Sequence, residues 1–213
     1  MPKIVVFGAA GKAGSRIVVE AAGRGHEVVA VARRVESMGD LPPGVVGAPG
    51  DSTSRETIKE LAAGADAVVV AINGPGSALW RDAAEALVET IRSLPEPHPR
   101  IIHMGSGATL VLPDGTRPLD NPGFPAQFMD VATGQASALD YYRNSEGVDW
   151  TYFSPPPLEF GPGERTGHYR TGMDHPVTDA DGRAVLSYED FAVALVDEIE
   201  QGRFVNTRFT AGY

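Results

Sequence analysis

The sequence predicts an α/β fold in which a doubly wound parallel sheet lies between two layers of helices, a three-layer αβα arrangement. Two observations support this prediction. Short β-branched runs alternate along the first half of the chain with amphipathic segments, which is typical of parallel strands joined by helices. The first run, residues 4–7, ends in three glycines at a spacing of three and passes directly into a helical pattern. We therefore expect a strand, a tight turn and a helix.

Three glycines form this turn, and each has its own reason to lack a side chain. Gly8 lets the chain turn sharply off the strand, Gly11 removes a Cβ that would block a pyrophosphate, and Gly14 lets the helix lie close to the sheet. The positive end of that helix would then meet the phosphates. A flexible loop is the competing interpretation, but the flanking strand and helix favour a Rossmann-type phosphate-binding turn. The predicted contacts here are Gly8, Ala10, Gly11, Lys12, Ala13 and Gly14.

The remaining elements of the first half follow from apolar runs and end signals. The first strand covers residues 3–8, and its helix ends at the glycine stop around 23–25. Apolar runs predict further strands at 26–32, 45–48 and 65–72. Ser54 is expected to cap a helix that reaches Ala63, and a longer helix is expected from about 77 to 94.

The second half has more turn residues. A fifth strand is expected at 100–104, followed by an irregular excursion at 110–125, a helix at 126–145 and a sixth strand at 149–153. Proline and glycine then predict a loop or hairpin lid between residues 155 and 182. Ser187 and Asp190 resemble a capping box, which predicts a helix to about 201 before a last strand at 208–210. There is no repeat or linker pattern, so we expect residues 1–213 to form one domain.

Composition limits the possible functions. The 213 residues are 42% hydrophobic, but no apolar run approaches the length of a membrane span. A formal net charge of -10 repels nucleic-acid phosphates and anionic lipid, so neither is an expected partner. The five histidines show no ligand spacing, and there is no cysteine, so no metal site is expected. No basic and apolar leader precedes the first strand, from which we expect a cytoplasmic protein.

Candidate ligand contacts gather at the ends of strands. Ligands of an open parallel sheet bind beyond the carboxyl ends of its strands, where the winding reverses. Six clusters at one such edge favour a single bound dinucleotide more strongly than any cluster alone. Besides the glycine turn, the residues at these ends are Arg33, Arg34, Asp51, Ser52, Ile72, Asn73, Gly74, Ser106, Ser154, Pro155 and Pro156.

The end of the second strand indicates which dinucleotide is bound. NAD sites usually carry an acidic residue there that accepts hydrogen bonds from the ribose hydroxyls. This chain has Arg33 and Arg34 instead. A guanidinium offers paired donors to a 2′-phosphate, which a carboxylate would repel, so we predict NADP. A solvated turn is the alternative interpretation of the two arginines.

The GxxGxxG spacing resembles that of extended and atypical short-chain dehydrogenases/reductases. The chain is most similar to small NAD(P)H-binding proteins related to NmrA-like regulators and to biliverdin/flavin reductases, over most of its length. The resemblance implies that Asp51 contacts the adenine amino group and that Ser106 lies beside the nicotinamide. Asp51 could equally be a turn residue or helix cap. The small residues from Ile72 to Gly74 would let the backbone approach a flat ring or ribose, or form a plain turn.

The chemistry is where the chain departs from the resemblance. Reductases of this superfamily commonly add a Tyr and a Lys spaced YxxxK to the serine, and no YxxxK occurs here. Gln135 and the pair Tyr141-Tyr142 stand near the expected place, and all three lysines lie in the first third of the chain. No general acid matched to a ketone alkoxide is evident, which argues against ordinary alcohol or ketone dehydrogenation. His103, within an apolar strand, is expected to be a core histidine.

Two functional hypotheses remain. In the first, the protein is an NADPH-dependent reductase of a small conjugated acceptor, such as a flavin, quinone or linear tetrapyrrole, which draws its proton from solvent. Ser106 would then orient the acceptor by a hydrogen bond, unless its hydroxyl only satisfies the backbone of its own turn. In the second, the protein binds NADP as a non-catalytic redox sensor of the NmrA-like type. The sequence leaves the substrate open, and does not decide between a monomer and a homodimer.

Overall fold

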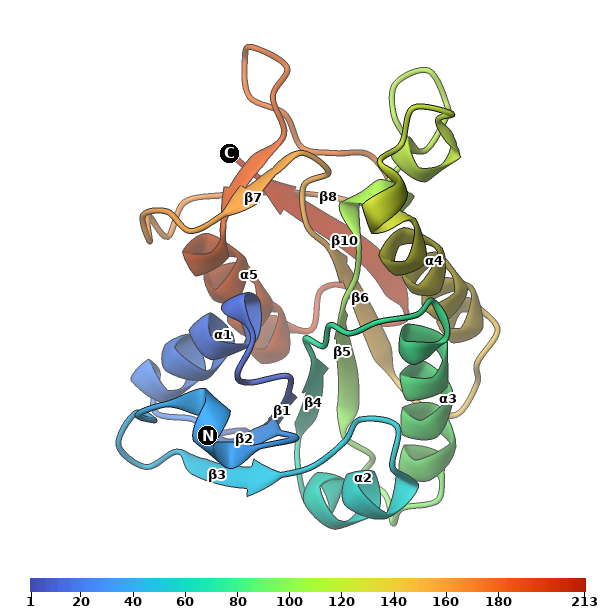
Figure 1. Cartoon of the computed structure of the whole chain (residues 1–213). Coiled ribbons are helices and arrows are strands. Elements are labelled where there is room, and N and C mark those ends of the chain that lie inside the picture. The colour runs from blue at the N-terminus through green and yellow to red at the C-terminus, as the bar shows by residue number, and fades with distance from the viewer.

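The computed structural model describes residues 1–213 and is built around an eight-stranded sheet (Figure 1). The strand order is β3-β2-β1-β4-β5-β6-β10-β8, and β8 alone runs antiparallel to its neighbour. The strands are β1 (Lys3–Phe7), β2 (Glu27–Ala32), β3 (Val46–Pro49), β4 (Ala67–Val70), β5 (Arg100–Met104), β6 (Trp150–Ser154), β8 (Arg170–Gly172) and β10 (Thr207–Gly212). Seven of these strands are parallel, so their carboxyl ends share one edge, and the winding reverses between β1 and β4.

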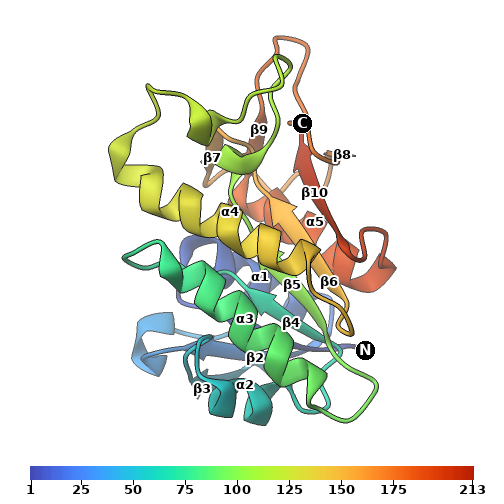
Figure 2. The ribbon, with the colours of Figure 1, turned by 90° about the vertical axis from the view of Figure 1, so that its right-hand side faces the viewer.

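Helices cover both faces of this sheet. They are α1 (Lys12–Gly23), α2 (Arg55–Ala62), α3 (Ala78–Arg92), α4 (Met129–Arg143) and α5 (Tyr188–Gln201). The helices α1 and α5 pack together on one face, while α2, α3 and α4 cover the other. Figure 2 shows α3 and α4 side by side in front of the sheet. The predicted doubly wound, three-layer fold is confirmed. None of the helices has the length and apolar character needed to cross a bilayer.

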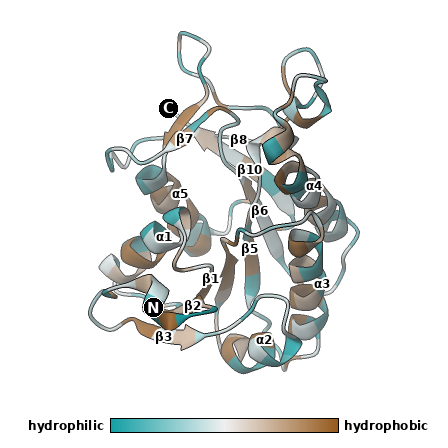
Figure 3. Ribbon diagram, viewed as in Figure 1, coloured by the Kyte–Doolittle hydropathy of each residue, from teal (hydrophilic) through white to brown (hydrophobic).

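The core divides into two buried layers, one on each face. Val5 and Phe7 point toward the α3 side, whereas Ile4 and Val6 point toward the α1 side, and all four are almost fully buried. A parallel strand covered on both faces has no solvent side, so its sequence is continuously apolar instead of alternating. This explains the unbroken apolar run of β1, which is coloured as hydrophobic in Figure 3.

Several predicted boundaries differ from the structure by a few residues, and two of them have a clear cause. The helix expected at 126–145 is α4, which begins at Met129 because residues 126–128 form a separate 3-10 turn after Pro125. The last strand is longer than expected and covers Thr207–Gly212, because β10 pairs with β6 on one side and with β8 on the other. The predicted cap of α5 is confirmed, since Ser187 Oγ accepts a hydrogen bond from the Asp190 N–H at 2.9 Å.

The lid segment is not a hairpin. The short strands β7 (Glu159–Gly161) and β9 (Val185–Ser187) pair in parallel, and β8, which lies between them in sequence, joins the main sheet beside β10. The long connection from 162 to 184 gives the chain room to cross over and pair in parallel. Residues 163–169, called the strap below, therefore run between two sheets.

Candidate functional site

Two of the three glycines in the turn are needed for close packing, and the third lies at the surface. Gly8 has φ +83°, and a Cβ there would lie 2.2 Å from the Ala71 carbonyl oxygen beyond β4. A Cβ at Gly14 would lie 2.2 Å from the Gly8 carbonyl oxygen. Gly11 is exposed, and a Cβ there would lie 3.1 Å from the Gly8 carbonyl oxygen, a tight contact but a looser one than at Gly8 or Gly14. Gly8 and Gly14 are therefore required by the fold itself, whereas Gly11 leaves the turn open to a ligand.

The N-terminal end of α1 offers free donors at this surface. Gly11 is the N-cap, no side chain caps the helix, and its first turn holds no acidic residue. The first N–H groups of a helix have no acceptor within the helix, and the helix dipole makes this end positive. Lys12 adds an exposed ammonium that takes part in no ion pair. The arrangement suits an anion such as a pyrophosphate.

Arg33 and Arg34 lie at the carboxyl end of β2, on the same edge of the sheet. Both are exposed, and their side chains make no hydrogen bond or ion pair, whereas Arg24, Arg100 and Arg208 are each bound to carboxylates. In a chain of net charge -10, two adjacent unpaired guanidinium groups are the conspicuous cationic feature of this edge. They are free to bind a phosphate through paired N–H donors.

The next two strand ends are occupied by local turns. Asp51 Oδ1 accepts hydrogen bonds from the N–H and the hydroxyl of Thr53, at 2.9 and 2.8 Å, and Ser54 caps α2 through the Thr57 N–H. Asp51 thus has the turn role, which leaves its other carboxylate oxygen free. Asn73 is exposed and accepts from the Gly74 N–H at 3.0 Å. The Ile72 carbonyl accepts from the indole of Trp80.

Outside the glycine turn, four predicted contacts are buried. Ser52, Ser154, Pro155 and Pro156 are all covered by neighbouring segments. A Cβ at Gly107 would lie 2.5 Å from the Pro155 carbonyl oxygen, so the chain after β5 packs directly on the chain after β6. The Ser154 hydroxyl is fully buried and has no partner. These residues lie at the predicted edge of the sheet, but their buried side chains support its surface from the interior.

Ser106 forms the corner at the end of β5. Its Oγ accepts a hydrogen bond from the Ala108 N–H at 3.2 Å, and its carbonyl accepts from the Thr109 hydroxyl at 2.7 Å. The hydroxyl therefore does satisfy its own turn, as the alternative interpretation expected. It is half-buried and retains its proton, so it can still donate one hydrogen bond to a ligand.

A buried polar cluster lies behind this corner and includes a residue that sequence reasoning missed. His103 Nδ1 and Nε2 lie 3.1 Å from the Tyr142 hydroxyl and 3.2 Å from Gln135 Oε1. Tyr152 of β6, whose role no motif signals, donates to Gln135 Oε1 at 2.7 Å. Burial lowers the pKa of His103 to about 4, so it is neutral and belongs to the core as predicted. Burial raises the pKa of both Tyr142 and Tyr152, which makes them poor acids.

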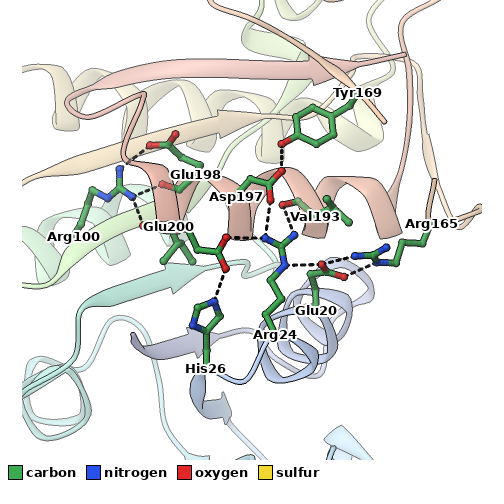
Figure 4. Close-up of polar contacts among 11 residues, drawn as sticks. Glu20, Arg24, His26, Arg100, Arg165, Tyr169, Val193, Asp197, Glu198 and Glu200 are labelled. Atoms are coloured by element: carbon green, nitrogen blue, oxygen red, sulfur yellow. Dashed lines mark hydrogen bonds and ion pairs between the residues drawn. The ribbon is translucent and has the colours of Figure 1, made fainter. Parts of the chain in front are cut away.

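The strap is held to the α1–α5 layer by carboxylates (Figure 4). Arg165 makes two 2.8 Å hydrogen bonds to Glu20, which also binds Arg24 at the end of α1. Arg24 reaches on to Asp197 and Glu200 of α5. Hydrogen bonds from Arg165, opposed by burial and aided by Arg24, lower the pKa of Glu20. Charged contacts thus join the strap to the two helices.

Taken together, the strand order, the tight glycine turn and the uncapped helix N-terminus define a Rossmann-type NAD(P)-binding protein. The chain belongs to the NAD(P)H-binding family, whose model matches residues 8–201. The matched residues include the glycine turn and the carboxyl ends of β2, β3, β4, β5 and β6.

Similar proteins span the whole chain. The uncharacterised YwnB protein of Bacillus subtilis is 33% identical over 212 residues, which cover 98% of this chain and 97% of that protein. Among solved structures, a candidate exported protein from Burkholderia pseudomallei is 37% identical with a TM-score of 0.88, and all of both chains is covered. A candidate NADH-flavin reductase from Streptococcus pneumoniae is 31% identical with a TM-score of 0.87, covering 100% of this chain and 99% of that one.

Proposed function

We propose that the protein is an NADPH-dependent reductase that transfers hydride to a small conjugated acceptor such as a flavin or quinone. The observation that carries the proposal is the chemistry around Ser106. The two tyrosines of the cluster behind this corner, Tyr142 and Tyr152, are buried, with raised pKa values and hydroxyls already hydrogen-bonded, and there is no lysine to assist them. A ketone would need such an acid, whereas a conjugated acceptor can take its proton from solvent.

The residues present fit a dinucleotide along the carboxyl edge. The first-turn N–H groups of α1 and Lys12 would hold the pyrophosphate, and the open face at Gly11 would admit it. Arg33 and Arg34 would hold the 2′-phosphate, which is why we propose NADPH over NADH. Bound NADPH would supply the hydride. Ser106 would donate its remaining hydrogen bond to the acceptor and so orient it.

The Streptococcus pneumoniae relative supports a reductase, because it is a candidate NADH-flavin reductase of similar fold along the whole chain. A relative from Bacteroides thetaiotaomicron, 30% identical with a TM-score of 0.90, is instead a candidate epimerase. The absence of an acid near Ser106 weighs against epimerase chemistry on an alcohol carbon. It also favours a second candidate function, a sensor that binds NADP(H) without turnover.

Oxidation of NADPH in the presence of flavins, quinones and a linear tetrapyrrole tests the proposal. We expect turnover with at least one acceptor, preference for NADPH over NADH, and no turnover in a Gly11→Val variant. Binding of NADPH by calorimetry without turnover on any acceptor would favour the sensor. Failure to bind either dinucleotide would overturn both functions.

A further inference from the structure

Gln135 of α4 joins three elements at the corner that carries Ser106. Its Nε2 donates to the carbonyl of Met104, the last residue of β5, at 3.1 Å. The Tyr152 hydroxyl of β6 can donate to Gln135 Oε1 at 2.7 Å or to the Gln135 backbone carbonyl oxygen at 2.8 Å. Gln135 is 4% exposed and Tyr152 is fully buried. One buried side-chain amide therefore bridges α4, β5 and β6 directly.

The Met104 carbonyl fixes the orientation of this amide, because a carbonyl oxygen can only accept a hydrogen bond. An amide oxygen can only accept, so the contact from His103 Nε2 at 3.2 Å requires that this nitrogen carries the proton. Nδ1 is then left to accept from the Tyr142 hydroxyl. A rotated amide would instead point its oxygen at the Met104 carbonyl oxygen, and neither of these atoms carries a proton. The observed orientation, with the NH₂ group on the Met104 carbonyl, is therefore the favourable one.

The corner itself rests on the Tyr152 ring. A Cβ at Gly105 would lie 1.9 Å from Tyr152 Cε1, so Gly105 packs directly against that ring. The ring is stacked on His103, with centroids 5.2 Å apart and an interplanar angle of 11°. The side-chain and backbone carbonyl oxygens of Gln135 both lie within hydrogen-bond distance of the hydroxyl end of the same ring. A displaced Gln135 would therefore disturb both the ring beneath the corner and the strand end that leads into it.

We infer that Gln135 is a positioning residue that fixes the Gly105–Ser106 corner through the Met104 carbonyl and the Tyr152 ring. It touches neither the dinucleotide nor the acceptor in this scheme. The inference rests on the proposed function, because a fixed corner matters for turnover only if Ser106 orients the acceptor. It predicts that substitutions at Gln135 lower turnover more than they weaken NADPH binding.

A Gln135→Glu variant provides a pH signature. A protonated glutamic acid can donate to the Met104 carbonyl and accept from Tyr152 and His103, as the glutamine does, whereas an ionised one cannot donate. Burial without a hydrogen-bonded cation should hold the pKa of the new carboxyl above its ordinary range. The groups that titrate or act by charge around this position are His103 on β5, Tyr142, Asp140 and Arg143 on α4, Tyr152 on β6 and Arg208 on β10.

We expect Gln135→Glu to turn over within about threefold of the unmodified protein near pH 5.5 and at least tenfold more slowly near pH 8.5, with NADPH affinity unchanged at both. Gln135→Leu should be slow at both pH values. Ile58→Ala, a core change on α2, which contributes no residue to the hydrogen-bonded cluster, serves as the control for lost stability and should keep the original pH profile. A Gln135→Glu profile that parallels that of the unmodified protein would overturn the inference.

Amide hydrogen exchange gives a readout that needs no turnover. Gln135→Leu should speed exchange at residues 104–109 at least fivefold relative to the rest of the sheet, and Ile58→Ala should not. Faster exchange with unchanged turnover would make Gln135 a purely structural residue and overturn the inference. If the unmodified protein fails to oxidise NADPH with every acceptor tested, the proposed function fails instead. Amide exchange alone then decides whether Gln135 fixes the corner. Unchanged exchange would then refute that role.

Discussion

Gly14 of α1 packs against the backbone of Gly8, so closely that a Cβ at Gly14 would lie 2.2 Å from the Gly8 carbonyl oxygen. Real Cβ atoms do not approach an oxygen so closely, and the backbone oxygen cannot swing away. Gly11, between them, is exposed and is not packed in this way. The glycines of this turn therefore have separable roles in folding and in binding.

Substitutions at Gly14 and Gly11 should separate these roles. Gly14→Ala should lower the free energy of unfolding by about 1–3 kcal/mol, because the turn must shift to admit the methyl group. Gly11→Val should remain folded, at a cost of about 1–3 kcal/mol for the change at the N-cap and the tight contact of its Cβ with the Gly8 carbonyl oxygen, but should lose dinucleotide binding. Denaturant titration and calorimetry measure the two effects. Undiminished NADPH affinity in Gly11→Val would contradict the placement of the pyrophosphate.

Arg33 and Arg34 should decide between NADPH and NADH. Replacing both with Ala should weaken NADPH binding by about 1.5–3 kcal/mol for each charge-assisted hydrogen bond that is removed, and leave NADH binding nearly unchanged. Lys59→Ala is the matched control, because Lys59 is also an exposed cation without a partner but lies in the last turn of α2. Equal affinity of the unmodified protein for the two dinucleotides would show that the arginines are a solvated turn.

The sequence predicted most of the fold because its signals are local. The apolar run into Gly8 and the serine before α5 each specify their own conformation, and the parallel order follows from alternating strands and helices. The pairing of β7 with β9 could not be predicted, because it depends on a crossover of more than twenty residues and on short strands with few side chains to set a register.

The candidate site was predicted in position but not in burial. The sequence shows which residues end or follow a predicted strand, and parallel strands all end at the same edge of the sheet. Ser154 was therefore placed at the correct edge. Whether its hydroxyl faces a ligand depends on how the segments after β5 and β6 pack, and these two segments meet where Gly107 lies against the Pro155 carbonyl. Tyr152 was missed for a similar reason, because its partner Gln135 is distant in sequence and no spacing rule joins a strand tyrosine to a helix amide.

His103 should make stability depend on pH. Burial lowers its pKa from the ordinary 6.5 to about 4, so between these values the unfolded chain binds a proton that the folded chain does not. Stability is therefore complete above about pH 7 and should fall by about 2 kcal/mol between pH 7.5 and pH 5. Glu20 and Asp190, with lowered pKa values, lose their contributions only at lower pH.

Urea titrations across this range, compared with a His103→Gln variant, test the assignment. Glutamine can donate to Gln135 and accept from Tyr142 without titrating, so its stability should be flat from pH 7.5 to 5. His168→Gln is the control, because His168 is exposed and its ring makes no hydrogen bond, and it should keep the slope. An unmodified protein without the slope would mean that His103 can be protonated in the folded state.

Asp190 should anchor the strap. Its Oδ1 accepts from the Gly167 N–H at 2.8 Å, and its Oδ2 accepts from the N–H and hydroxyl of Thr166 and from the Tyr213 hydroxyl. In Asp190→Asn, one oxygen becomes an NH₂ group that faces a donor, which should cost about 1–3 kcal/mol of stability. Amide exchange and limited proteolysis should locate the loosening at residues 163–169.

Glu189→Gln, one position earlier, is the matched control for Asp190→Asn. Its amide oxygen can keep the hydrogen bond from the Gly163 N–H, and only a surface ion pair with Arg16 is removed. Such a pair contributes at most about 1 kcal/mol. The strap should therefore stay protected in Glu189→Gln, and equal loosening in both variants would contradict the anchoring role of Asp190.

Ser106→Ala should slow NADPH oxidation about threefold to tenfold. A serine hydroxyl without a nearby acid has too high a pKa to supply a proton efficiently, so its proposed role is a single neutral hydrogen bond to the acceptor, worth about 0.5–1.5 kcal/mol. The loss of its bond to the Ala108 N–H also affects the turn, and Thr109→Val, which removes the neighbouring hydroxyl bond to the Ser106 carbonyl, is the control for that effect.

Steady-state turnover with one flavin or quinone compares the variants. An equal loss in both would mean that the hydroxyl serves only its turn, and a loss of 1000-fold in Ser106→Ala alone, beyond the roughly 100-fold or more expected for an essential proton donor, would reveal a dedicated acid-base site at this corner.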